Sequence, residues 1–465
     1  MNEEDSFLYD TFPQEFLWGV ATSAFQCEGG TKAGGRGVSI WDTFCLDPSN
    51  ILDKSNADVT SDSYHKYQED IKLIKELGVN FYRFSISWAR IIPDPTGSGE
   101  VNSAGVQYYN NLIDGLLAIG VMPLVTLYHF DLPQTIEDKG GFLNESVLVD
   151  CFKKYADVCF SEFGDRVKYW ITFNEPKEIA TLGYGNGCLA PGIKSPFDGV
   201  YQAAHNLIKA HASVWHLYDH SYRNSQNGKI FISLSSNFFM PKDANCPEDV
   251  EAVELAHQFS IGWFAHPIFI DGDYPPIMKN KIAEISKIEG REKSRLPEFT
   301  EEEKKFIKGT SDFLGYNYYT SRLVSVPDSD MPTDIDMSLF FLYVVPQGIR
   351  GILNWLKNEY NSVAVFMTEN GFSDSSGTVD DPERVQFFKS HINELLKAVK
   401  IDGCNVVAYT AWTLLDNFEW IFGYTCRFGL VSVDFDTEEK CRTPKKSFYF
   451  YSKVIKDNGF PAISE

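Results

Sequence analysis

Residues 169–176 read Tyr-Trp-Ile-Thr-Phe-Asn-Glu-Pro, an apolar run that ends in an amide, an acid and a proline. Aromatic and β-branched side chains favour a strand. Proline cannot donate a hydrogen bond to a sheet, so it closes the strand. Glu175 therefore lies at the carboxyl end of a buried strand, where ligand clefts of parallel α/β sheets occur. Alone, such an acid is more often a solvated loop residue.

A second segment has the same design. Residues 363–371 read Val-Ala-Val-Phe-Met-Thr-Glu-Asn-Gly, so a second apolar run delivers Glu369 at its end. Two acids placed by two strand ends indicate a pair that meets across one cleft.

The rest of the chain supplies more segments of the same kind. Eight apolar runs of strand length occur at residues 16–22, 81–88, 122–129, 169–175, 229–235, 312–319, 363–369 and 405–412. Helical patterns lie between them at residues 63–77, 104–119, 147–163, 202–218 and 382–399.

Strand–helix alternation repeated eight times predicts a parallel (β/α)₈ TIM barrel. We expect one catalytic domain over residues 8–460, with long βα loops around the active site, notably residues 237–311 and 325–362. An open doubly wound sheet is the alternative, but Gly29-Gly30 lacks the GxGxxG frame of its phosphate loop. The charge run at residues 301–305 is expected to begin a solvated helix.

Composition narrows the possible partners. The formal charge of −22 argues against nucleic acid and against an anionic membrane surface. No apolar run reaches membrane-spanning length, and the first residues, Met-Asn-Glu-Glu-Asp, do not resemble a signal peptide. Nine cysteines show no metal-binding spacing, which favours a reducing, cytoplasmic location and predicts neither metal nor cofactor.

Polar residues gather at the expected carboxyl ends of the strands: Gln26, Arg83, His129, Asn174, Glu175, Asn317, Tyr319, Glu369 and Trp412. A rim closed only by packing would favour apolar residues there, so this set indicates a polyhydroxylated small-molecule ligand. Two carboxylates without a metal motif, a nucleophile elbow or a phosphate loop point to glycoside hydrolysis. That reaction needs one protonated acid and one ionised carboxylate. Whichever glutamate Arg83 contacts is the candidate nucleophile.

The motifs resemble those of glycoside hydrolase family 1, the β-glucosidase family, and most closely its animal members. Besides residues 172–176 and 368–371, the matching segments are residues 16–30, 82–85, 129–134, 415–420 and 427–430. The resemblance implies a retaining β-glycosidase with Glu175 as general acid/base and Glu369 as nucleophile, oriented by Arg83 and Tyr319. It implies substrate contacts from Gln26, His129, Asn174, Asn317, Tyr319, Trp412, Glu419, Trp420 and Phe428, with Glu419 accepting from the sugar 4- and 6-hydroxyls.

Several alternatives remain open. His129, Trp420 and Phe428 could be core residues, and Glu419 a solvated loop acid. A binding-only protein of the klotho kind would be expected to lack one catalytic glutamate. An insect-type thioglucosidase keeps both acids, and a transglycosidase shares them. A 6-phospho-glycosidase would need a phosphate-binding cluster that the segment 416–420 lacks.

Four positions depart from the family pattern: Cys27, Lys177, Tyr318 and Cys426. Lys177 and Arg322 would favour an anionic leaving group such as a glucosinolate if they line the entrance, but ordinary surface cations are the preferred interpretation. We expect β-D-glucosides, with fucosides and galactosides tolerated, and a monomer or homodimer.

Overall fold

The computed structural model describes residues 7–325 and 342–462. Eight parallel strands close into a barrel in the order β1-β10-β9-β7-β5-β4-β3-β2. Their bounds are β1 Leu17–Ala21, β2 Phe81–Ser85, β3 Met122–Tyr128, β4 Tyr169–Asn174, β5 Lys229–Ser235, β7 Leu314–Asn317, β9 Val365–Asn370 and β10 Val406–Trp412. Because β1 pairs with both β2 and β10, the sheet has no edge. The predicted (β/α)₈ barrel is confirmed, and an open sheet is excluded.

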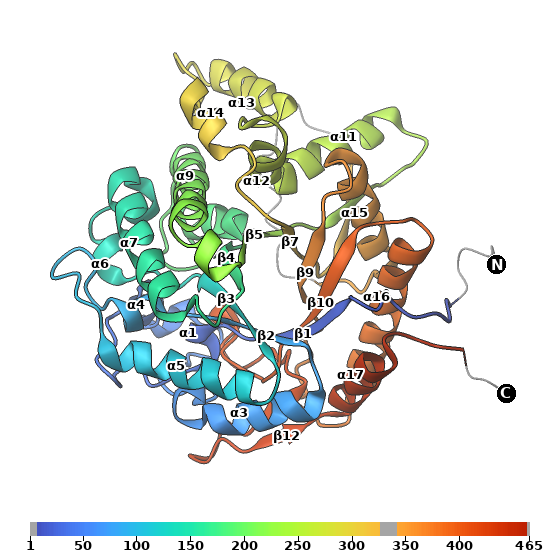
Figure 1. Ribbon diagram of the computed structural model, residues 1–465. Helices are drawn as coiled ribbons and strands as arrows, with labels where there is room; N and C mark the ends of the chain where they lie inside the picture. The colour runs from blue at the N-terminus through green and yellow to red at the C-terminus, as the bar shows by residue number, and fades with distance from the viewer. Residues whose placement is uncertain (1–6, 326–341, 463–465) are drawn as a thin grey trace.

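Helices surround the strands on all sides (Figure 1). The longer ones are α3 Ser63–Leu77, α5 Ser103–Ala118, α7 Glu145–Phe163, α9 Gly199–Ser221, α11 Pro247–His257, α13 Pro276–Ile288, α14 Glu301–Ile307, α15 Pro346–Glu359, α16 Pro382–Lys400 and α17 Lys446–Asp457. The charge run does begin a helix: Thr300 and Glu303 form a capping box at the start of α14.

Shorter elements fill the loops. Two small sheets join β6 Phe238–Pro241 to β8 Ser321–Val324 and β11 Val431–Val433 to β12 Arg442–Pro444. The short helices are α1 Ala24–Cys27, α2 Ile40–Phe44, α4 Trp88–Ile91, α6 Gln134–Glu137, α8 Pro176–Glu178, α10 Arg223–Gln226 and α12 Trp263–His266. Single 3₁₀ or π turns occur at Pro48–Asn50, Gly141–Leu143, Ile179–Gly183, Gln258–Gly262, Pro267–Asp271 and Trp420–Phe422.

The largest error in the predicted strand ends is at β2. Residues 81–88 were expected to form one strand, yet β2 ends at Ser85 and helix α4 begins at Trp88. Arg83 is consequently the middle residue of β2 rather than its end. Gln26 likewise lies in the short helix α1, beyond the end of β1. Arg83 therefore reaches the site from within strand β2, and Gln26 reaches it from helix α1.

The barrel interior changes character along its axis. An apolar layer contains Phe81, Leu124, Ile171, Phe231, Phe366 and Ala408. Further along the strands, Arg83, Thr126, Ser233 and Thr368 form a buried polar layer joined by hydrogen bonds. The apolar layer supplies the packed core of a TIM barrel, and the polar layer supports the residues at the carboxyl ends of the strands.

Irregular strand pairing turns two site residues inward. The register between β4 and β5 shifts between Ile171 and Asn174. Strict alternation from the inward Ile171 would direct Phe173 into the barrel, but Phe173 packs outside it against Phe142 and Phe152. A similar shift between β7 and β9 occurs at Asn317 and Glu369. Without these irregularities, Asn174 and Glu369 would face the helices.

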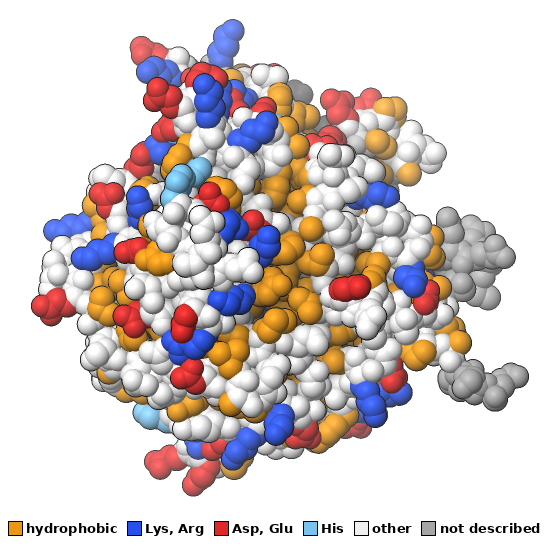
Figure 2. Space-filling view, viewed as in Figure 1, with side chains coloured by type: hydrophobic (Ala, Val, Ile, Leu, Met, Phe, Trp, Pro, Cys, Tyr) orange, Lys and Arg blue, Asp and Glu red, His pale blue; other side chains and the backbone are white. Residues whose placement is uncertain are grey.

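The surface carries mixed charge. On the face shown in Figure 2, Lys and Arg side chains are interspersed with Asp and Glu side chains. Within residues 7–325 and 342–462, none of the helices has the length and apolar character that crossing a membrane requires. The nine cysteines are all free thiols.

Candidate active site

A cavity of ≈ 220 Å³ opens at the carboxyl ends of the barrel strands. Ten of the predicted site residues line it: His129, Asn174, Glu175, Asn317, Tyr319, Glu369, Trp412, Glu419, Trp420 and Phe428. Trp420 and Phe428, which sequence spacing alone could not distinguish from core aromatics, therefore face the cavity. Gln26 and Arg83 are buried behind this lining.

Glu369 is held at both oxygens. Arg83 Nη1 donates to Oε1 at 2.6 Å, and the Tyr319 hydroxyl donates to Oε2 at 2.6 Å. Burial and the neighbouring acids raise the pKa of Tyr319 well above its usual value, so its hydroxyl keeps the proton that it donates. A carboxyl group that accepts a hydrogen bond on each oxygen is suited to react as a carboxylate.

Arg83 organises the polar layer beneath the two acids. Its Nη2 donates to Asn174 Oδ1 at 2.6 Å, and its Nε donates to Thr126 Oγ1 at 3.1 Å. Its Nη1 also donates to the carbonyl of Thr368 at 2.8 Å. A planar guanidinium with its donors engaged in this way fixes Asn174 and Glu369 relative to each other.

Asn317 connects that layer to Glu175. Its Oδ1 accepts from Ser233 Oγ at 3.1 Å and from Thr368 Oγ1 at 2.6 Å, which sets the orientation of the amide. Its Nδ2 then donates to Glu175 Oε1 at 2.8 Å and to Asn174 Oδ1 at 3.1 Å. Asn317 in strand β7 thus anchors one oxygen of Glu175, as Arg83 in strand β2 anchors one oxygen of Glu369.

Glu175 has an unusual backbone and an unusual environment. It adopts a left-handed conformation (φ 50°, ψ 60°) immediately before Pro176, and its N–H donates to Ser233 O at 2.8 Å. Strained residues of this kind cluster at functional sites. Burial first, then the charges of Glu369 and Glu178, raise the pKa of Glu175 well above its usual value. Of the two acids, Glu175 is consequently the one whose surroundings favour the protonated form.

Glu419 is a second protonated acid in the cavity. Burial, with the charge of Glu369, raises its pKa to about 8, although a hydrogen bond from Gln26 lowers it. Gln26 Nε2 lies 3.2 Å from Glu419 Oε2 and 3.1 Å from the carbonyl of Phe418. In the free protein, Glu419 can therefore both donate and accept hydrogen bonds below pH 8.

Flat rings form one side of the cavity. His129 lies nearly parallel to Trp412 and to Trp420, with centroid separations of 5.7 and 6.1 Å. Burial and Arg83 lower the pKa of His129 well below its usual value, so the ring is neutral. Asn174 Nδ2 lies 3.3 Å from Nε2, and an amide nitrogen can only donate, so Nε2 accepts and Nδ1 carries the proton. Such rings suit the apolar face of a sugar.

Polar and apolar residues complete the lining of the cavity. The polar ones are Lys177, Glu178, Ser235, Ser236 and Asn237, and the apolar ones include Phe130, Leu182, Leu189, Ile421 and Phe422. Lys177 pairs with Glu178 at 2.8 Å. Arg322 is not among the lining residues; its guanidinium lies 5.3 Å from the ring of Tyr343. Among the described residues that line the cavity, Lys177 is therefore the one Lys or Arg, and it is paired with Glu178.

The remaining departures from the family pattern lie outside the cavity lining. Cys27 is buried, and burial raises its pKa to about 12, which makes the thiol unreactive. Tyr318 is buried and shares a hydrogen bond with Ser321.

The sequence did not indicate several residues that support or border the site. Ser233, Thr368 and Thr126 anchor the site residues, and the polar residues 235–237 border the cavity. Ser233 and Ser235 occur in a predicted strand that received no site residue, so alternate hydroxyl side chains near its end were the available signal. Among the described residues, no group of three or more His, Cys, Asp or Glu side chains could hold a metal ion.

Comparison with known proteins identifies the family. The model of glycosyl hydrolase family 1 matches residues 8–460. The chain belongs to glycosyl hydrolase family 1. This confirms the resemblance drawn from the two strand-end motifs.

The similar family 1 sequences belong to enzymes that are named for different substrates. The chain is 46% identical over 467 residues to human cytosolic beta-glucosidase, covering 97% of this chain and 99% of the relative. It is 45% identical over 463 residues to myrosinase 1 of Brevicoryne brassicae, covering 96% and 98%. The whole length of this chain also aligns with human lactase/phlorizin hydrolase at 46% identity, but the alignment covers only 25% of that protein.

Solved family 1 structures share the fold closely. An aphid myrosinase superposes with a TM-score of 0.91 at 44% identity, covering 96% of this chain and 99% of the other. A rice beta-glucosidase in a covalent complex with Glc superposes with a TM-score of 0.87 at 40% identity, covering 95% and 98%.

Proposed function

We propose that the protein is a retaining β-glycosidase that hydrolyses β-D-glucosides by double displacement. The observation that carries the proposal is the contrast between the two acids. Glu369 accepts hydrogen bonds on both oxygens from Arg83 and Tyr319, whereas burial and two neighbouring acids keep the proton on Glu175. A pair with one ionised and one protonated carboxyl group is what glycoside hydrolysis requires.

The first displacement forms a covalent glycosyl-enzyme. Glu369 attacks the anomeric carbon as the bond from that carbon to the leaving oxygen breaks. Glu175 gives its proton to that oxygen, so the aglycone leaves as a neutral alcohol or phenol. In the second displacement, Glu175 accepts a proton from water, the water oxygen attacks the anomeric carbon, and the bond to Glu369 breaks. Two inversions leave the β configuration unchanged.

The roles of the other residues follow from their positions. Asn174, held by Arg83 and Asn317, would bind the 2-hydroxyl, and Tyr319 and Arg83 would orient Glu369. Glu419 and Gln26 would bind the 4- and 6-hydroxyls, and Trp412 and Trp420 would pack on the sugar. A group that both donates and accepts is not strict about the 4- or the 6-position, so we expect fucosides and galactosides to be tolerated.

Sequence similarity supports a glycosidase but does not distinguish O-glycoside from S-glycoside substrates. Relatives named beta-glucosidase and myrosinase are equally similar to this chain. The pairing of Lys177 with Glu178 and the position of Arg322 outside the cavity give little support to an anionic leaving group. A klotho-like binding role is disfavoured because both acids are present. Hydrolysis rates for aryl glucoside, galactoside and fucoside, cellobiose and a glucosinolate distinguish these substrates.

Chemical rescue tests the assignment of the two acids. Glu175→Ala should lose activity on alkyl glucosides but regain it with azide and an activated aryl glucoside, giving the β-glucosyl azide. Glu369→Ala should not turn over the same substrate with retention. If neither variant behaves in this way, the pair has been wrongly chosen.

We also propose that residues 8–460 act as one catalytic domain in the cytosol, without a cofactor, as a monomer or homodimer. The nine free thiols and the similarity to cytosolic relatives support that location. Subcellular fractionation and light scattering of the full chain test these points.

A further inference from the structure

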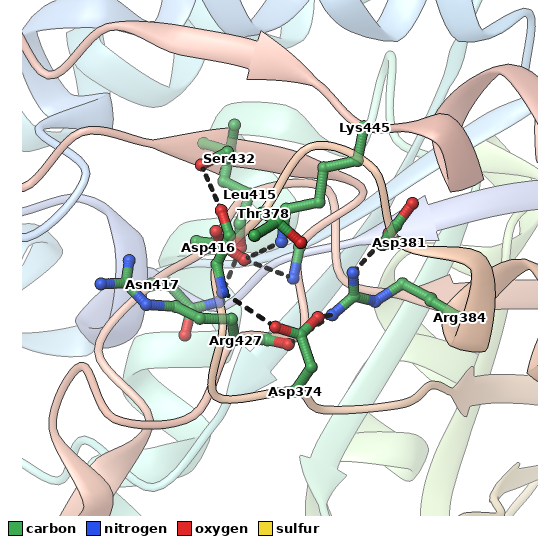
Figure 3. Close-up of polar contacts among 12 residues, drawn as sticks. Asp374, Thr378, Asp381, Arg384, Leu415, Asp416, Asn417, Arg427, Ser432 and Lys445 are labelled. Atoms are coloured by element: carbon green, nitrogen blue, oxygen red, sulfur yellow. Dashed lines mark hydrogen bonds and ion pairs between the residues drawn. The ribbon is translucent and has the colours of Figure 1, made fainter.

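Five charged side chains, four of them buried and the fifth partly buried, form a group that does not line the cavity. They are Asp374, Asp381, Arg384, Asp416 and Lys445, hereafter the ionic cluster (Figure 3). The side chains of Arg384, Asp416 and Lys445 are 0% exposed, and that of Asp381 is 3% exposed. Buried ion pairs are weak sources of stability, because apolar side chains of the same volume often serve as well. Stability alone therefore explains the ionic cluster poorly.

One half of the ionic cluster holds the loop that carries Glu419. Asp416 Oδ1 accepts from Lys445 Nζ at 2.8 Å and from the N–H of Gly429 at 2.9 Å. Asp416 begins the segment that ends in Glu419 and Trp420, and Gly429 follows Phe428. A Cβ atom on Gly429 would lie 2.1 Å from the backbone nitrogen of Asp416, so the two backbone segments approach as closely as glycine permits.

The other half joins this loop to the loop that follows Glu369. Arg384 pairs with Asp374 and Asp381, and its Nη2 donates to the carbonyl of Arg427 at 2.6 Å. The backbones of Asp374 and Arg427 exchange hydrogen bonds of 3.0 and 2.8 Å. Figure 3 shows Arg384 pointing toward Asp374 and Asp381. Asp374 lies in the segment between strand β9, which carries Glu369, and helix α16.

We propose that the ionic cluster is a positioning device for sugar binding. It fixes residues 415–430 against the loop of the nucleophile, so that Glu419, Trp420 and Phe428 keep their places around the glycone. The inference rests on the proposed function. None of its five members touches the substrate; they act through the residues that do.

Substitutions at Asp416 and Lys445 test the proposal. Asp416→Asn keeps an acceptor for Gly429 but leaves Lys445 without its counter-charge. We expect KM for an aryl β-glucoside to rise at least about tenfold, with kcat changed less than about threefold. KM for the matching β-fucoside, which lacks the 6-hydroxyl, should rise less. Lys445→Gln should act in the same direction, and the double variant, which is neutral at both positions, should recover part of the loss.

A matched control separates positioning from stability. Glu394→Gln breaks a buried ion pair of 2.6 Å with Lys397 inside α16, away from both loops. It should lower the melting temperature without changing either KM. If Asp416→Asn fails to fold, Asp374→Asn, whose side chain is 19% exposed, should give a smaller change of the same kind.

Two results would count against the inference in different ways. Folded variants with a lowered melting temperature but with wild-type KM values and glucoside-to-fucoside ratio would overturn the positioning role alone. Failure of the wild-type protein to hydrolyse any β-glycoside would overturn the proposed function and the inference with it.

Discussion

At the scale of single residues, the neighbours of a carboxyl group decide its role. Glu175 and Glu369 follow similar strand segments, but only Glu369 is contacted by Arg83 and Tyr319. Glu175 instead receives one amide hydrogen bond and the repulsion of two acids. Residues with similar sequence contexts thereby acquire different surroundings, and this difference supports the proposed division into acid and nucleophile.

The charge of Glu369 should be measurable at Glu175. Glu369→Gln removes a negative charge that raises the pKa of Glu175, so that pKa should fall, because the ionised form loses a repulsion. Titration of the carboxyl carbon of Glu175 by NMR measures the change directly and does not require the variant to be active. Gln26→Ala, which touches neither acid, is the comparison. An unchanged or higher pKa in Glu369→Gln would show that the two acids are not coupled.

Glu419 should make stability depend on pH. Its pKa is about 8 in the folded protein and near 4.3 when unfolded, so the folded state retains a proton that the unfolded state loses between these values. The contribution of Glu419 to the free energy of unfolding is therefore greatest below about pH 4.3 and is lost as the pH rises to about 8. Glu419→Gln should not show this loss. Relative to wild type, the variant should gain on the order of 2–4 kcal/mol in unfolding free energy between pH 5 and 8.

Urea unfolding of both proteins at pH 5, 6.5 and 8 provides the measurement. Parallel pH dependence in the two proteins would mean that Glu419 is already ionised in the folded state.

At the scale of elements, local signals in the sequence set the ends of helices. Asn144 caps α7 by accepting from the N–H of Val147, while its Nδ2 donates to the carbonyl of Lys139. The same asparagine begins the sequon Asn144-Glu145-Ser146. Its amide nitrogen, the atom that glycosylation would modify, is therefore engaged in a hydrogen bond.

Asn144→Ala should lower the unfolding free energy by about 1 kcal/mol, because it removes the cap of a nineteen-residue helix. Asn144→Asp keeps the acceptor and should lose less. Thermal melts of the two variants beside wild type decide the point, and activity should be unchanged in both because α7 does not line the cavity. Equal stability of Asn144→Ala and wild type would show that the cap contributes nothing.

At the scale of the whole molecule, barrel closure brings the two acids together. We expect their carboxyl groups to lie roughly 5 Å apart, the separation of retaining enzymes. The first sugar released from an aryl β-glucoside should then be the β anomer, as proton NMR during early turnover would reveal. Release of the α anomer first would require room for a water between the acids, and the double-displacement mechanism would be wrong.

The sequence by itself determined the fold class, the two catalytic candidates and ten residues of the cavity lining, because strand length, alternation and strand-end motifs are local properties. Strand β5 and helix α3 were predicted with the bounds that the structure has. Residues 86–88 were predicted as strand because their apolar run resembles one, whereas Ser87 is the N-cap residue of helix α4, which begins at Trp88.

Only the tertiary structure decided which acid Arg83 contacts, that Glu419 has a raised pKa, and that Ser233 and Thr368 support Asn317. Each depends on residues far apart in sequence and on strand register. The register shifts at Asn174 and Glu369 turn these side chains inward, and a displacement of one residue would reverse them. Burial likewise raises a pKa only after the barrel has closed around the group, so no local pattern encodes it.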